Sequence, residues 1–264
     1  MTDPTDPAAP RRSHASKSIR ATARPRDLMA EAARPGAWRA SVITLFPDAF
    51  PGPLGLSLTG AALERGLWSL DVTDLRRFGL TRHRNVDAPP AGGGPGLVLR
   101  ADVVGPAIEA ARGPGPLVYL SPRGTPFTQA TARAWAAGPG VTLLCGRFEG
   151  VDQRALDHHG AEEVSLGDFV LTGGELAAFA MLDAALRLRP GVLGNAASTE
   201  DESHAEGLLE HPHYTKPAEW EGRRIPAVLT SGDHAKVAAW RRAEALALTR
   251  ARRPDLWAAR GGDD

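Results

Sequence analysis

Hydrophobic periodicity divides the chain into a polar N-terminal segment and a globular remainder. Residues 1–38 are dominated by Pro, Ala, Arg, Ser and Asp and show neither the strand period of 2 nor the helical period of 3.6. Their few large apolar side chains cannot offset the entropy of ordering them. The acidic residues among them argue against a transit peptide. We therefore predict a disordered tail over residues 1–38.

Four apolar runs predict buried strands in the globular remainder. They span residues 41–46, 116–121, 141–145 and 162–171. Runs without polar alternation are typical of strands covered on both faces, as in a parallel sheet with flanking helices. The segments between the last three runs, 125–137 and 150–160, are long enough for crossover connections. The pattern predicts an α/β fold whose ligands lie where prolines and glycines follow the strands.

Helical periodicity adds elements between and after the strands. Helices are predicted over residues 56–67 and 102–111. A further helix begins near Glu175 and is apolar almost all round, which predicts burial against a sheet or a partner subunit. Residues 234–250 predict a small C-terminal helical domain. Their apolar face is expected to comprise Val237, Trp240, Ala243 and Leu246.

Composition argues against two classes of protein. Of the 264 residues 42% are hydrophobic and 23% charged, as expected of a chain that can bury a core. Cys145 is the only cysteine, which excludes an internal disulfide, and its place after an apolar run predicts a core residue rather than a nucleophile. No segment approaches the roughly 18 apolar residues of a membrane-spanning helix. Neither a membrane protein nor a secretory signal peptide is expected.

Charge is balanced overall but unevenly distributed. Lys+Arg and Asp+Glu number 31 each, yet residues 1–40 carry a net +4 (8 against 4) and residues 41–219 a net −7 (14 against 21). Residues 220–264 carry a net +3 (9 against 6). Nearly all cations are arginine, a bias that a GC-rich genome also produces. Arginine content alone is therefore weak evidence for nucleic-acid binding.

Several common ligand motifs are absent from the sequence. No GxxxxGKS/T loop occurs, and Gly92–Gly96 does not fit GxGxxG, so ATP hydrolysis and conventional dinucleotide binding are not expected. The dense histidine pairs lack partners at zinc spacing, and no GxSxG motif occurs. Glycines do follow three successive strands, where they either let the backbone approach a flat ligand or make tight turns. The sequence pattern alone does not distinguish these two roles of the glycines.

Eight segments that occur in one order resemble a known family. They are ITLFPDAF (43–50), RHRNVDAPPAGGGPG (82–96), YLSPRG (119–124), CGRFEGVDQR (145–154), SLGDFVLTGGE (165–175), PGVLGN (190–195), AEGLLEHPHYTKP (205–217) and LTSGDHAKVAAWRR (229–242). Together they closely resemble the bacterial tRNA (guanine-N1)-methyltransferases of the TrmD type, which modify guanosine at position 37. The resemblance runs from about Ser41 to Leu256.

This resemblance implies a fold, a division into domains and an assembly. The fold is the trefoil-knotted α/β fold of SPOUT methyltransferases, a rare exception to the rule that chains do not knot. Residues 39–195 would bind S-adenosylmethionine, 196–204 would form an interdomain linker with the active-site loop, and 205–264 a C-terminal helical tRNA-binding domain. The protein would be a cytoplasmic homodimer, without a membrane partner, whose partner subunit completes each site.

The methyl donor implied by the resemblance is S-adenosylmethionine, held by the three glycine-containing loops after the strands. The matching contact residues are Tyr119, Leu120, Ser121, Pro122, Gly146, Phe148, Glu149, Gly150, Ser165, Leu166, Gly167, Asp168, Phe169, Val170, Leu171, Gly173 and Gly174. Phe148 and Phe169 stand where the family commonly has tyrosine, which keeps the ring and removes a hydroxyl. No protein metal site is expected, and a dependence on Mg²⁺ stays open.

Methylation of guanine N1 places clear demands on a site. N1 carries a proton, which a carboxylate within hydrogen-bond reach can remove. A guanidinium can stabilise the negative charge that then accumulates on the base carbonyl. Arg187 matches the family's catalytic arginine. Its alternative roles are to complement the helix dipole or to pair with Asp183 at i,i+4.

The general base is the one motif that departs from the family. The family has an aspartate in a D-S-F/H triplet, where this chain reads Glu202-Ser203-His204 with Asp201 just before it. The alignment favours Glu202, with Asp201 as the alternative. If neither reaches N1, the chain would bind donor and RNA but methylate weakly. An enzyme of the same fold that acts on another RNA nucleoside is a further alternative.

Cations near the C-terminus are the predicted tRNA contacts. Arg241, Arg242, Arg250, Arg252 and Arg253 would bind the tRNA backbone, which positions the anticodon stem-loop without reading its sequence. The alternative is a solvated helix face. Specificity would come from the guanosine and its 5′ neighbour, splayed out of the loop into the dimer cleft.

Overall fold

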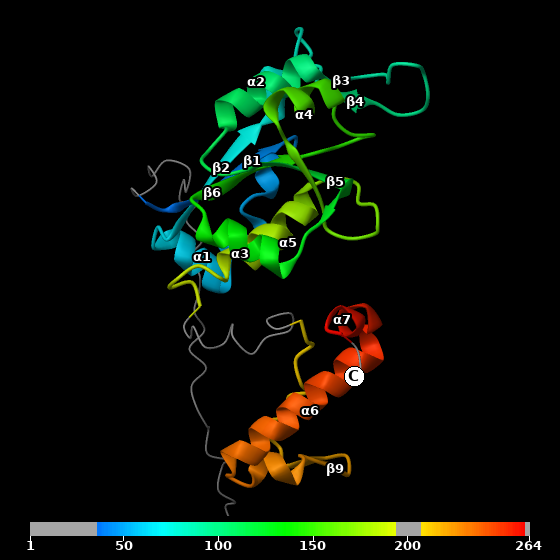
Figure 1. Ribbon diagram of the computed structural model, residues 1–264. Coiled ribbons are helices and arrows are strands. Elements are labelled where there is room, and N and C mark those ends of the chain that lie inside the picture. The colour runs from blue at the N-terminus through cyan, green and yellow to red at the C-terminus, as the bar shows by residue number, and fades with distance from the viewer. Residues whose placement is uncertain (1–35, 194–206, 262–264) are drawn as a thin grey trace, which may run out of the picture. The chain divides into compact units, whose positions relative to one another are not determined.

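The computed structural model describes residues 36–193 and 207–261 (Figure 1). The predicted tail lies outside these ranges except for residues 36–38, and the predicted active-site loop, 196–204, lies wholly outside them. Within the described ranges, no helix is both long enough and apolar enough to cross a membrane.

Residues 36–193 are built on a five-stranded, all-parallel sheet. Its strands are β1 (Trp38–Thr44), β2 (Trp68–Asp74), β5 (Leu117–Pro126), β6 (Gly140–Cys145) and β7 (Glu162–Ser165). Their order in the sheet is β2-β1-β6-β5-β7, and all four neighbouring pairs are parallel. The predicted α/β class and parallel sheet are confirmed.

Helices cover both faces of the sheet (Figure 1). They are α1 (Ser57–Glu64), α2 (Ala101–Ala111), α3 (Gln129–Ala137), α4 (Gln153–His159) and α5 (Glu175–Leu186). One buried cluster joins side chains of α1, α3 and α5 to one sheet face, and a second joins α2 and α4 to the other. Alternate residues of a strand serve opposite clusters, so Val42 packs in the first and Ile43 in the second. The predicted crossover helices are thus present as α3 and α4.

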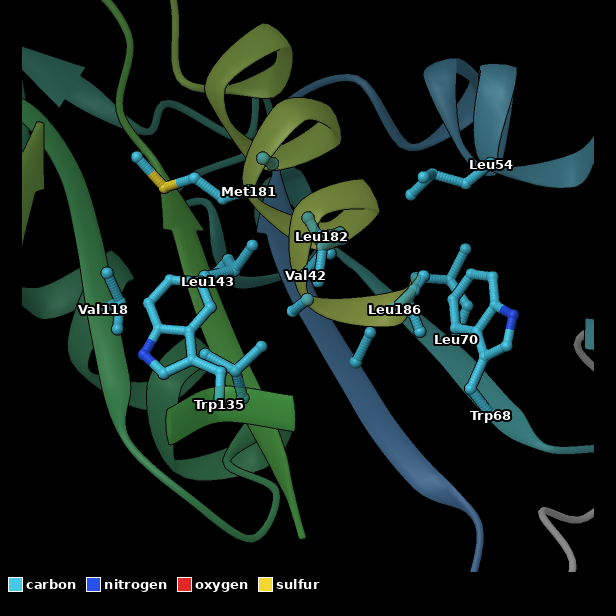
Figure 2. Close-up of a cluster of buried hydrophobic side chains, with 14 of the residues drawn as sticks. Val42, Leu54, Trp68, Leu70, Val118, Trp135, Leu143, Met181, Leu182 and Leu186 are labelled. Atoms are coloured by element: carbon cyan, nitrogen blue, oxygen red, sulfur yellow. The ribbon is translucent and has the colours of Figure 1, made fainter. Parts of the chain in front are cut away.

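The first cluster explains the nearly all-apolar sequence of α5. Met181, Leu182 and Leu186 pack against Val42 and Leu143 of the sheet (Figure 2). Seven of its twelve residues are buried. Of the two predicted alternatives, burial against the sheet is therefore confirmed.

Short elements connect these layers. Three 3₁₀ turns, η1 (Pro47–Ala49), η2 (Gly52–Gly55) and η3 (Leu75–Phe78), follow β1 and β2. The two-residue strands β3 (Asp87–Ala88) and β4 (Val98–Leu99) pair antiparallel and enclose the glycine-rich segment 89–97. β4 also bonds to the loop after β6 through Leu99, whose N–H donates to Gly150 O at 2.9 Å.

Residues 207–261 combine two helices with a short hairpin and irregular segments. They contain the hairpin strands β8 (Glu219–Trp220) and β9 (Arg223–Arg224), the turn η5 (Ala227–Thr230), and the helices α6 (His234–Arg252) and α7 (Pro254–Ala259). The predicted apolar face of α6 is only partly covered, because Val237, Trp240 and Leu246 are half-buried but Ala243 is exposed. The residues of α6 that are fully buried are Ala245 and Thr249.

Strand β1 begins inside the predicted tail. Trp38 is 1% exposed, and its Nε1 donates to Trp135 O of α3 at 2.9 Å. The expectation that residues up to 38 form a tail was therefore wrong at its last residue. A lone tryptophan beside arginines gives no periodicity, so only packing against α3 reveals its place in the core.

The ends of β5 and β7 also differ from the prediction. β5 does not stop at Pro122 but resumes pairing at Thr125, because Leu120 and Thr125 both pair with Val164. The residues between them bulge out of the ladder. β7 ends at Ser165 rather than Leu171 because the Ser165 hydroxyl accepts a bond from Gly167 N and turns the chain.

Replacing Trp38 with alanine is expected to lower the free energy of unfolding by about 3–5 kcal/mol, the usual cost of deleting a buried aromatic side chain. The loss combines a cavity beneath α3 with the missing hydrogen bond to Trp135 O. Urea unfolding of the full chain measures it. Trp38→Phe, which keeps most of the ring volume, should cost clearly less, and equal losses for both variants would contradict this account.

Candidate active site

A cavity of about 340 Å³ lies at the carboxyl ends of β6 and β7 and at the bulge in β5. The predicted contact residues line it with two exceptions, Gly167 and Asp168. Those that line it are Tyr119, Leu120, Ser121, Pro122, Gly146, Phe148, Glu149, Gly150, Ser165, Leu166, Phe169, Val170, Leu171, Gly173 and Gly174. The fold thus brings three loops, separate in sequence, around one cavity at the edge where parallel sheets hold ligands.

Seven further lining residues were missed by sequence reasoning. They are Val98, Arg123, Arg147, Val151, Val164, Thr172 and Ala177. Arg123 and Arg147 stand inside the recognised segments, so their position next to glycine was the available signal. Val98 belongs to β4, and nothing in the sequence pairs that short strand with the loop after β6.

Tyr119 lines the cavity, and its ring explains why the first residue of the second loop, Gly146, has no side chain. A Cβ on Gly146 would lie 2.7 Å from the Tyr119 ring. Gly150 adopts φ +126°, a conformation that side chains rarely adopt, with the Tyr119 hydroxyl nearby. Burial raises the pKa of the Tyr119 phenol, so its hydroxyl stays protonated at neutral pH.

Gly174 is required for space rather than for conformation. Its φ of −77° suits any residue. A Cβ there, however, would lie 2.8 Å from Cys145 Cα and 3.1 Å from Gly146 N, both of them main-chain atoms. The close approach lets Gly174 N donate to Gly146 O at 3.0 Å and joins the second loop to the third.

Phe148 holds an unusual backbone conformation at the mouth of the cavity. Its φ is +58°, in the left-handed region that non-glycine residues seldom occupy. Its ring is 54% exposed, as is that of Phe169 on the opposite loop. Strained residues and exposed rings together are typical of a surface that binds a partner or ligand.

Charged groups at the cavity are held by specific partners. Arg123 Nη2 lies 3.1 Å from Glu163 Oε1 and 3.2 Å from Gln153 Oε1. Glu149 packs against Gly96, where a Cβ would meet its side chain, and its N–H donates to Leu97 O at 2.9 Å. The glycine-rich segment after β3 thus supports the second loop from behind.

Of the three predicted catalytic residues, only Arg187 lies within the described ranges. Arg187 is the half-buried C-cap residue of α5, with its N–H bonded to Asp183 O at 3.0 Å, and it does not line the cavity. Glu202 and Asp201 lie outside the described residues. The predicted catalytic grouping therefore stays a prediction.

Cys145 has the structural role predicted for it. It is fully buried in the first core cluster and free. Burial raises the pKa of its thiol well above the usual value, which makes it a poor nucleophile. Among residues 36–193 and 207–261, no three His, Cys, Asp or Glu side chains gather as metal ligands.

The sequence of the chain was compared with models of known protein families. Residues 38–259 match the model of the family described as tRNA (Guanine-1)-methyltransferase TrmD. The chain belongs to the TrmD family. The matched range takes in the three cavity loops of the TrmD fold as well as α6 and α7.

Curated relatives agree with membership of the TrmD family. A tRNA (guanine-N(1)-)-methyltransferase of Roseobacter denitrificans is 64% identical over 233 residues, which cover 87% of this chain and 97% of the relative. One from Cereibacter sphaeroides is 66% identical over 239 residues (86% and 96%), and one from Nitrobacter winogradskyi is 63% identical over 225 (84% and 94%). Membership of the TrmD family implies S-adenosylmethionine as the methyl donor.

Proposed function

We propose that this chain transfers a methyl group from S-adenosylmethionine to N1 of guanosine at position 37 of tRNA, next to the anticodon. Family membership over residues 38–259 supports the reaction class. The observation that carries the proposal is the cavity, which most of the residues proposed as donor contacts line. The protein acts in the cytoplasm, where tRNA is modified.

The cavity suits the proposed donor in shape and chemistry. Gly146 and Gly174 leave main-chain surface open where a Cβ would collide with Tyr119 or Cys145. Such surface accepts a flat purine, while the Leu120, Leu166 and Leu171 side chains supply apolar contacts. When bound, the sulfonium supplies the methyl group and leaves as a neutral thioether. The loops therefore act chiefly by aligning donor and acceptor.

Proton removal from guanine N1 is assigned to Glu202, with Asp201 as the alternative. A carboxylate beside N1 takes the proton and makes the nitrogen nucleophilic. Arg187 then stabilises the charge on the base carbonyl. Because Arg187 lies outside the cavity of the single chain, the proposed homodimer has to bring it to the base. No step assigned here uses a metal ion.

The finer architecture is part of the same proposal. The sheet order β2-β1-β6-β5-β7 is compatible with a trefoil knot through which the cavity loops pass. Residues 39–195 form the donor-binding domain, 196–204 the linker with the base, and 205–264 a C-terminal helical domain that binds tRNA. The tail before β1 has no assigned role.

The C-terminal part carries the proposed tRNA contacts. Arg241, Arg242, Arg250 and Arg252 are exposed on α6, and Arg253 is paired with Asp255. Their guanidinium groups suit phosphate oxygens. These contacts would position the anticodon stem-loop and leave recognition to the guanosine and its 5′ neighbour.

A methyl-transfer assay tests the proposal. Transcripts that carry guanosine or adenosine at position 37 are incubated with labelled donor and the full chain, and the guanosine transcript alone should be methylated. Binding of donor and RNA without product would favour a non-catalytic protein of the same fold. Failure of both transcripts despite activity on bulk RNA would favour another nucleoside.

A further inference from the structure

A buried carboxylate stands at the start of α5. Glu175 is 5% exposed, and its Oε1 accepts a 2.6 Å hydrogen bond from Thr44 Oγ1. Its Oε2 lies 2.8 Å from Arg147 Nη2. A buried carboxylate is costly unless it is paired, and removing one partner leaves the other uncompensated. The Glu175 carboxylate is therefore paired with the Arg147 charge by proximity, although its Oε2 makes no hydrogen bond.

The Arg147 side chain also contacts two other parts of the chain. Its guanidinium lies over the Phe46 ring, 4.2 Å from the centroid. Nη1 donates to Thr172 O at 3.3 Å, and the guanidinium fills the space in which Gly173 would carry a Cβ. One side chain thus connects the end of β1, the loop after β6 and the turn before α5.

Thr44 closes these contacts into a ring. Its hydroxyl donates its only proton to Glu175, which leaves a lone pair to accept the Phe46 N–H at 2.9 Å. Phe46, in turn, lies beneath Arg147. We call Thr44, Phe46, Arg147 and Glu175 the Arg147 clamp. Each member restrains the next, so the guanidinium has little freedom to leave.

The clamp borders the cavity from behind. Arg147, Thr172 and Gly173 line the cavity, whereas Glu175 and Thr44 do not. Main-chain contacts also join the loop after β6 to the turn before α5. They are the Gly174 N–Gly146 O bond and the bridge between Arg147 and Gly173. The Thr172 carbonyl is reached by the guanidinium itself. The Arg147 side chain therefore adds a contact to these main-chain contacts, and its orientation contributes to the spacing of the two walls.

We propose that Glu175 is a positioning residue that acts through Arg147. It holds the loop after β6 and the turn before α5 at the separation that the methyl donor requires. This inference rests on the proposed function, because the ligand concerned is the donor of that reaction. The ion pair contributes to donor affinity although Glu175 itself does not line the cavity.

Calorimetric titration of the full chain with S-adenosylmethionine tests the inference. Glu175→Gln keeps an oxygen for Thr44 but turns an amide N–H₂ toward the guanidinium. It should raise Kd about tenfold to a hundredfold, because the two cavity walls are then less preorganised for the donor. Arg147→Lys keeps the charge opposite Glu175 and loses the planar fork and the stacking on Phe46. It should weaken binding similarly while the chain stays folded. In Glu175→Gln the KM for the donor should rise, while the turnover number at saturating donor should change by less than about threefold.

Asp71→Asn is the matched control. Asp71 pairs with Arg39 Nε at 2.6 Å between β1 and β2, and neither residue lines the cavity, so donor affinity should stay as in the wild type. Wild-type Kd in Arg147→Lys or in folded Glu175→Gln, even with a lower melting temperature, would overturn the inference and leave a merely structural ion pair. A wild-type chain that fails to bind the donor would instead contradict the proposed function.

Discussion

Replacing Glu202 with glutamine is expected to lower the turnover number about a hundredfold to ten-thousandfold, the usual contribution of a general base. Glutamine has the same length and shape but cannot take the N1 proton. Affinity for S-adenosylmethionine should be unchanged, because the proposed donor contacts lie in the three cavity loops. Single-turnover methylation of a guanosine-37 transcript, with calorimetry of donor binding, measures both quantities.

Asp201→Asn is the companion to this experiment. If Glu202 is the base, Asp201→Asn should retain most of the activity. The reverse outcome, an active Glu202→Gln and an inactive Asp201→Asn, would assign the base to Asp201. Full activity of both variants would show that neither carboxylate removes the proton and that the proposed mechanism is wrong.

Replacing Gly174 with alanine is expected to weaken donor binding about tenfold to a hundredfold, because the new methyl group forces the two loops apart and overpacking of this kind costs about 1–3 kcal/mol. The new Cβ would lie 2.8 Å from Cys145 Cα and 3.1 Å from Gly146 N, and main-chain atoms cannot rotate away. The Gly174 N–Gly146 O bond would lengthen with them. Calorimetry with S-adenosylmethionine reports the change.

Gly138→Ala is a closely matched control for this change. Gly138 has φ −76°, almost the value of −77° at Gly174, and stands at the C-terminal end of α3. A Cβ there would meet its nearest atoms at 3.5 Å, an ordinary contact. Its donor affinity should equal that of the wild type. Equal weakening in both variants would mean that backbone entropy, not the closeness of the loops, causes the loss.

Strands in the middle of the sheet were predictable because burial on both faces leaves a simple pattern. The runs in β1, β5 and β6 are apolar at nearly every position, and their burial is nearly complete. β2 was missed for the opposite reason. It is an edge strand that pairs only with β1, and beyond Leu70 its residues are half-buried, so its sequence WSLDVTD alternates with polar residues. Such a segment also reads as a loop.

The candidate site also has a part that the sequence predicted and a part that it did not. Its glycines and aromatic rings stand in recognisable segments, and most of the predicted contacts line one cavity. The Arg147 clamp could not be predicted, because Thr44 and Glu175 are 131 residues apart and neither carries a local pattern. A glutamate at the start of a helix usually faces water near the helix dipole. Only the packing of α5 against β1 buries it.

The sequence by itself determined the parallel α/β class, the strands of the sheet centre, the helix that packs on it and the family to which the chain belongs. These features follow from local periodicity and from short sequence motifs, and neither requires knowledge of contacts between distant residues. The tertiary structure alone decided that Trp38 belongs to the core, that β5 resumes beyond its bulge, and that Glu175 meets Arg147. Each of these depends on the register and packing of segments far apart in the chain, and such contacts leave no trace in any single stretch of sequence.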